Sequence, residues 1–73
     1  MNLFEVSARI SGLLAALEGM RAIMETRSGI AEDVAAQGLD YILSATMDNA
    51  IDEAGRLASA AHRLALEQIR ATG

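Results

Sequence analysis

The sequence predicts an all-α fold: an antiparallel helical hairpin that dimerises into a four-helix bundle. Three observations indicate this fold. Proline is absent and alanine occurs fifteen times among 73 residues, which favours helix over strand. Apolar residues recur at helical spacing on both sides of a single strong break, near Gly29. The apolar fraction of 52% exceeds what one small core can hide, which indicates burial between copies.

The first helix is predicted over residues 2–26. Asn2 is a good N-cap, and Glu5 stands three residues later, where a capping-box carboxylate would lie. Apolar residues then follow alternating three- and four-residue steps, as in the a/d seam of a coiled coil. The residues of this predicted seam are Leu3, Val6, Ile10, Leu13, Leu17, Met20 and Met24.

The opposite face of the first helix consists of small residues in the same rhythm. A glycine inside a helix costs about 1 kcal/mol relative to alanine, so two glycines on one face call for an explanation. One interpretation is a close approach by another helix, and the other is an exposed alanine-rich surface that tolerates both glycines. Under the first interpretation the partner-binding residues are Ala8, Gly12, Ala15, Gly19 and Ala22.

A break follows at residues 27–29. Gly29 can adopt the left-handed conformation that ends a helix, and Ser28 could cap the next one. Residues 30–71 are predicted to form one long helix, or a short helix followed by a long one. Gly38 is the first candidate for a kink, and residues 44–49 are the second.

The long region carries a broad apolar stripe whose C-terminal half is mostly alanine. Residues 39–70 as one helix would be roughly 48 Å long, against roughly 37 Å for residues 2–26, at about 1.5 Å per residue. A simple hairpin therefore leaves an overhang, which a second copy could cover. The predicted dimer-interface residues are Leu43, Met47, Ala50, Ala54, Leu57, Ala61 and Leu64.

The charges are distributed unevenly. The net charge is -4, and the six arginines form no basic stripe, so nucleic acid is not expected as a partner. Residues 28–53 carry six acids and no base, whereas residues 54–73 are net basic. This gradient favours antiparallel pairing of two long helices, although the acidic patch could instead bind a basic surface. Within the first helix, Glu5 and Arg9 are expected to form a helical ion pair.

No chemistry-bearing motif is evident. His62 is the only histidine and cysteine is absent, so neither a metal site nor a bound cofactor is expected. No phosphate-binding loop or nucleophile–base pair is present, and we expect no catalytic residues and no enzymatic activity. The longest uncharged stretch, residues 10–17, is too short to cross a bilayer, and no secretory leader is evident. A cytoplasmic location is therefore expected.

The sequence as a whole predicts a single helical domain over residues 1–73. The leading hypothesis is a non-enzymatic protein–protein interaction module, a small regulator, inhibitor or chaperone-like adaptor that acts as a homodimer. One alternative is a structural subunit that self-assembles into a larger helical array. Another is an acidic inhibitor that occupies a basic nucleic-acid-binding groove. The arginine-only, alanine-rich composition is typical of a GC-rich bacterium or its phage.

Overall fold

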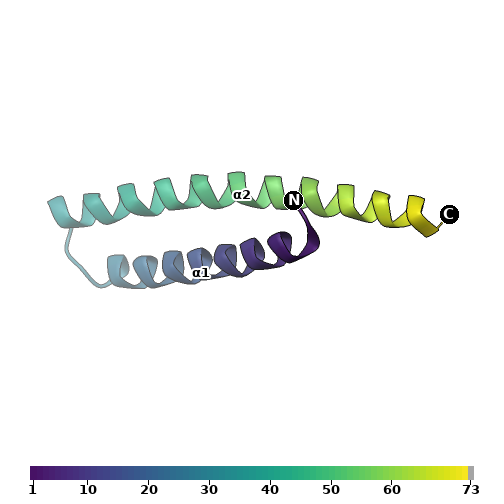
Figure 1. Cartoon of the computed structure of the whole chain (residues 1–73). Coiled ribbons are helices and arrows are strands. Elements are labelled where there is room, and N and C mark those ends of the chain that lie inside the picture. The colour runs from purple at the N-terminus through teal and green to yellow at the C-terminus, as the bar shows by residue number, and fades with distance from the viewer. Residues whose placement is uncertain (73) are drawn as a thin grey trace.

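The computed structural model describes residues 1–72 and consists of two helices, α1 (Leu3–Ser28) and α2 (Val34–Thr72). They run antiparallel and side by side, and the C-terminal part of α2 extends beyond the start of α1 (Figure 1). The molecule is a rod with extents of 60 × 15 × 14 Å. The predicted helical hairpin is thereby confirmed, including the overhang.

Helix α1 begins as the sequence predicts but ends differently. The Asn2 side chain accepts a hydrogen bond of 2.8 Å from the amide of Glu5, which satisfies one donor of the first turn. At the other end, Gly29 has φ -96°, so the expected left-handed conformation is wrong. The Gly29 amide instead donates to Thr26 at 3.1 Å and the Ile30 amide to Arg27 at 3.4 Å. These tightened i→i+3 bonds satisfy the last carbonyls without a positive φ.

Helix α2 begins at Val34 and is capped by Asp33, whose side chain accepts a 3.0 Å hydrogen bond from the amide of Ala36. The prediction that Ser28 caps this helix is wrong, because Ser28 is the last residue of α1. From Val34 onward the helix is continuous, with no kink at Gly38 or within residues 44–49. Gly38 is exposed, and a β-carbon at this position would meet no atom within 4 Å. The glycine is therefore not needed to let α1 approach α2.

A single seam joins the two helices. Among residues 1–72, sixteen are at least partly buried, and all sixteen lie at alternating three- and four-residue steps. The seven on α1 are Val6, Arg9, Leu13, Ala16, Met20, Ile23 and Arg27. The nine on α2 are Ala36, Leu39, Leu43, Thr46, Ala50, Glu53, Leu57, Ala60 and Leu64.

The seam on α1 is rotated relative to the predicted one. Three residues belong to both, Val6, Leu13 and Met20, but the other predicted seam residues are exposed: Leu3, Ile10, Leu17 and Met24. Their places toward α2 are taken by Arg9, Ala16, Ile23 and Arg27. The rotation has a physical reason, because it brings Arg9 and Arg27 of α1 against acidic side chains of α2.

The core of the hairpin is thin. Six hydrophobic residues of the described part of the chain are buried, and half of them are alanines: Val6, Met20, Ala36, Ala50, Leu57 and Ala60. No large side chain among the described residues is fully buried. Two helices that share one groove provide a single layer of contact, whereas stable small domains enclose a core between more elements. The isolated hairpin is therefore expected to be marginally stable.

The cap at Asp33 generates a first prediction. Asp33→Ala should lower the free energy of unfolding by about 1 kcal/mol, because the amide of Ala36 loses its acceptor at the start of α2. Urea unfolding followed by circular dichroism measures the change. Asp48→Ala removes an exposed acid in the middle of the same helix and should change stability by less than about 0.5 kcal/mol. Equal losses for the two variants would contradict the capping role.

Candidate interaction surface

An ion pair in the seam joins Arg9, near the start of α1, to Glu53, near the middle of α2. The Arg9 guanidinium donates two hydrogen bonds to the Glu53 carboxylate, one of them from Nε to Oε2 at 2.9 Å. The helical pair expected between Glu5 and Arg9 is thus replaced by a contact between helices. The hydrogen bond from Arg9 lowers the pKa of Glu53 below its ordinary value of 4.5 and outweighs the opposing effect of burial. A polar pair among apolar layers fixes the register of two helices.

A second ionic cluster lies where α1 meets the loop. Arg27 donates to Asp40 on α2 at 2.9 Å and also to Glu32 in the loop. These hydrogen bonds raise the pKa of Arg27, the bond to Glu32 having the larger effect. The cluster ties the loop to both helices, so ion pairs hold the hairpin both near its middle and at its closed end.

One long side of the hairpin is apolar, and we call it the apolar flank. It contains the large α1 residues that the seam leaves out, beside a stripe on α2 that begins with large residues and continues with alanines. All are exposed, for example Leu17 at 47% and Ile51 at 62%. The apolar flank consists of Leu3, Ile10, Leu17, Met24, Met47, Ile51, Ala54, Ala58, Ala61 and Ala65.

Two shallow grooves show that both helices contribute to this flank. One groove, of about 160 Å³, has Leu17 of α1 on one side and Met47, Ile51 and Ala54 of α2 on the other. A second groove, of about 370 Å³, has Leu3 of α1 opposite Ala61 and Ala65 of α2, with Gln68 at its end. The apolar flank is therefore one surface built by two helices and not two separate stripes.

The small residues of α1 lie toward the other side of the hairpin. We call Ala8, Gly12, Ala15, Gly19 and Ala22 the glycine flank, and all five are exposed. Ala8 and Gly12 line a hollow with Thr46 and Asn49 of α2. A β-carbon on Gly12 or Gly19 would meet no atom within 4 Å, so neither glycine permits a close approach of α2. The sequence-predicted partner-binding residues thus stay together, and their role remains a prediction.

The predicted dimer-interface residues divide between two surfaces. Four face α1 along the seam of the same chain: Leu43, Ala50, Leu57 and Leu64. The other three, Met47, Ala54 and Ala61, lie on the apolar flank. The predicted interface lacks the α1 residues of the flank, which are Leu3, Ile10, Leu17 and Met24. Their three-to-four spacing is visible in the sequence, but the same spacing also fits the seam.

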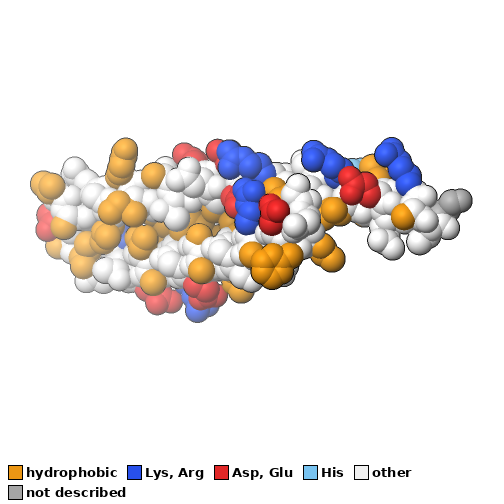
Figure 2. Space-filling view, viewed as in Figure 1, with side chains coloured by type: hydrophobic (Ala, Val, Ile, Leu, Met, Phe, Trp, Pro, Cys, Tyr) orange, Lys and Arg blue, Asp and Glu red, His pale blue; other side chains and the backbone are white. Residues whose placement is uncertain are grey.

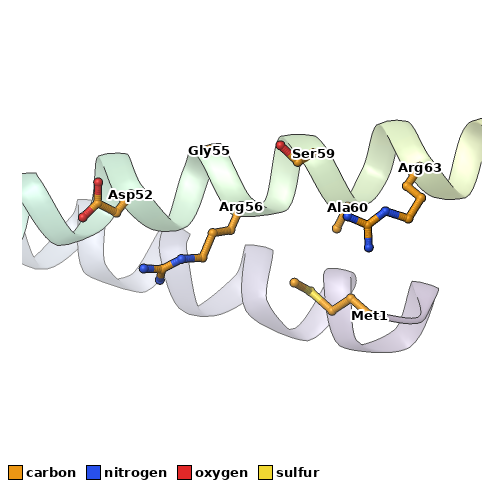
Figure 3. Close-up of a pocket in the computed structure, with 7 residues that line it drawn as sticks. All are labelled: Met1, Asp52, Gly55, Arg56, Ser59, Ala60 and Arg63. Atoms are coloured by element: carbon orange, nitrogen blue, oxygen red, sulfur yellow. The ribbon is translucent and has the colours of Figure 1, made fainter.

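Charged residues gather elsewhere on the rod. Figure 2 shows one long side, on which arginine side chains lie over the C-terminal half of α2 while the end near the loop is mostly hydrophobic. Arg56, Ser59 and Arg63 line a hollow of about 510 Å³ with Met1 and Asp52. In Figure 3 the Arg63 side chain points toward the N-terminal end of α1, where Met1 lies, whereas the Arg56 side chain extends away from Met1. The hollow is a shallow basic depression between the helices.

The single histidine, His62, is exposed on α2. Within residues 1–72 no three histidine, aspartate or glutamate residues form a group that could hold a metal ion. No helix in that part of the chain is long and apolar enough to cross a membrane. The chain matches no protein-family model, no curated protein and no solved structure.

The ion pair in the seam predicts a pH dependence. Because the pKa of Glu53 is lowered in the folded state, its contribution to stability is present above its unfolded pKa of about 4.5 and is lost as the pH falls through the lower folded value. Wild type should therefore be more stable than Glu53→Gln at neutral pH, and the difference should shrink in acid. Thermal unfolding across the acidic range measures it. The exposed-acid control Asp48→Asn should show little difference at any pH, and a constant gap for Glu53→Gln would refute the assignment.

The open surroundings of the two glycines predict a gain in stability. Gly12→Ala together with Gly19→Ala should raise the free energy of unfolding by about 1 kcal/mol per site, since each β-carbon meets no neighbour and alanine favours helix. Urea unfolding and mass measurement should be run on the same samples. A stabilised protein of unchanged mass means that copies of the chain do not meet at the glycine flank. A loss of stability or a change of mass would mean that another helix approaches there.

Proposed function

We propose that this chain is a non-enzymatic protein–protein interaction module that acts as a homodimer through helix–helix packing. In this proposal two hairpins bury their apolar flanks against each other and form a four-helix bundle in the cytoplasm. The outer faces, including the glycine flank, then remain available to a protein that the dimer regulates, inhibits or chaperones. The proposed module acts without a catalytic residue or a cofactor, and it binds neither nucleic acid nor a membrane.

The observation that carries this proposal is the apolar flank itself. Large side chains remain about half exposed along the length of the hairpin, among them Leu17, Met47 and Ile51. They are contiguous across both helices, whereas scattered single hydrophobic residues on a surface are ordinary and need no partner. A continuous apolar surface on a rod with a thin core favours burial against a second protein surface.

The thin core supports coupling of folding and assembly. Of the buried residues within 1–72, Val6, Met20 and Leu57 are large or branched, and the other three are alanines. Burial of apolar surface contributes roughly 25 cal/mol per Å², so a hairpin with so little burial gains much of its stability from whatever covers the flank. The proposed dimer therefore predicts that stability increases with protein concentration.

The test uses two isoleucines of α2 with similar exposure. Ile51 is 62% exposed on the apolar flank, and Ile42 is 50% exposed but does not line either groove of that flank. Ile51→Glu should weaken the dimer by at least about 100-fold, because association would bury two unpaired carboxylates. Ile42→Glu should leave the dimer intact. Light scattering over a concentration series, with circular dichroism on each sample, measures mass and helicity together.

Each outcome has a definite meaning. A wild-type mass of two chains that Ile51→Glu alone reduces to one supports the proposal. A stable single chain at high concentration would refute it, because the exposed flank would then need no cover. Mass that grows without limit would favour the alternative of a self-assembling structural subunit. Dissociation by Ile42→Glu but not by Ile51→Glu would place the interface on the other side of the rod.

A further inference from the structure

The apolar flank is shaped for a second copy in one particular orientation. We propose that the two hairpins of the homodimer pack with their α2 helices antiparallel and with Ala54 at the two-fold axis. This inference rests on the homodimer proposed above. Each α2 then faces the partner's α2, and positions equally distant from Ala54 oppose each other. The apolar flank of one chain is thus covered by the apolar flank of a second copy.

The side chains of the apolar flank become smaller along α2, and this favours antiparallel packing. On the apolar flank the N-terminal half of the helix contributes Met47 and Ile51, whereas the C-terminal half contributes only alanines. Antiparallel packing places the larger residues of one copy against the alanines of the other, so that both spaces are filled. With Ala54 at the axis, Met47 opposes the partner's Ala61 and Ile51 lies against the partner's Ala58. The surface is therefore complementary to itself.

Polar residues at the two ends of the apolar flank determine the register of the two α2 helices. Asp40 and Gln68 are the polar residues that stand one heptad beyond Met47 and Ala61 on the same line of α2. With Ala54 at the axis they oppose each other, and polar meets polar at both ends of the interface. A shift by one heptad in one direction would place Asp40 against the partner's Ala61, and in the other direction Met47 against the partner's Gln68. Only the register centred on Ala54 leaves the apolar residues paired among themselves.

The charge of α2 also changes along the helix. The first half of α2 carries Asp40, Asp48, Asp52 and Glu53, and the second half carries three arginines against one acid. Antiparallel packing brings the basic half of each α2 near the acidic half of the other along the rod. Arg56 and Arg63 line the hollow on the other side of α2, so this attraction acts at a distance and not as an ion pair across the flank. The unpaired end of α2, residues 65–72, then lies beside residues 36–43 of the partner, near the acidic loop. The overhang seen in Figure 1 is covered by this arrangement.

The parallel arrangement satisfies the size condition only toward the open end of the hairpin, where the alanines of α2 would face the partner's Leu3. If the two-fold axis ran along the rods, each α2 would lie over the partner's α1, whose flank residues are all large. Met47 would then meet the partner's Leu17, with no small residue to receive either side chain. Both overhangs would project from the same end without cover. The antiparallel arrangement is therefore the one that the surface favours.

Cysteine cross-linking tests the arrangement, because the natural chain contains no cysteine. Ala54→Cys should be captured as a covalent dimer by a thiol reagent with a reach of about 10 Å, the spacing of packed helix axes. The matched control is Ala45→Cys on the same helix. Its two copies would lie eighteen residues apart along the axis, roughly 27 Å at about 1.5 Å per residue, and should not be linked.

A mixing experiment checks the register independently. Met47→Cys alone and Ala61→Cys alone should each give little cross-linking, because their copies would lie fourteen residues apart, roughly 21 Å. After unfolding and refolding together, the two variants should cross-link to each other. All variants are first checked for wild-type helicity and mass, so that a folding defect is recognised.

The outcomes separate this inference from the proposed function. A monomeric mass at high concentration overturns the homodimer and this arrangement with it. A dimeric mass without cross-linking of Ala54→Cys overturns only the antiparallel arrangement and leaves the homodimer standing. Equal cross-linking of Ala54→Cys and Ala45→Cys also overturns it, since proximity at the axis would then not be specific. Cross-linking of Ala54→Cys and of the mixed pair, with none at Ala45→Cys, supports the arrangement.

Discussion

The structure depends on one constraint: two helices share only one groove, and both helices carry more apolar surface than that groove can cover. The seam uses one stripe of α1, from Val6 to Arg27, and its counterpart on α2. What remains is not scattered, because the three-to-four spacing that defines the seam also defines the stripe next to it. The exposed apolar flank therefore follows from the same periodicity that forms the hairpin, and it runs along both helices.

The position of the ion pair decides which stripe is left outside. Arg9 and Glu53 occupy opposing seam positions, and their double hydrogen bond requires that α1 turn this side toward α2. Turning α1 the other way would bury Ile10 and Leu17 but leave Glu53, already partly buried, without its counter-charge, which is costly inside a protein. Arg27 acts in the same sense at the closed end, through Asp40. The observed rotation is thus the one in which both arginines of the seam are paired with acids of α2.

Much of the fold could be predicted from the sequence, because local signals determine it. The cap at Asn2, the break near Gly29 and the helical periodicity each act within a few residues. The rotation of α1 could not be predicted, since it depends on a contact between residues forty-four positions apart. Within its own helix, Arg9 has Glu5 as an equally good partner. The start of α2 is ambiguous in the sequence for a related reason: Ser28 and Asp33 are both good caps, and the loop length decides between them.

The candidate surface is only half visible in the sequence for the same reason. The sequence assigns Met47, Ala54 and Ala61 to an interface between copies, but it assigns their neighbours on α1, Ile10 and Leu17, to the seam. Once the rotation of α1 turns these two residues outward, they join the α2 stripe as one continuous flank. The ion pair and the flank are thus linked through this rotation. In the proposed dimer, a change that removes both charges of the ion pair would relax the rotation. The pair would then act on assembly through the surface it exposes and not through any contact with the second copy.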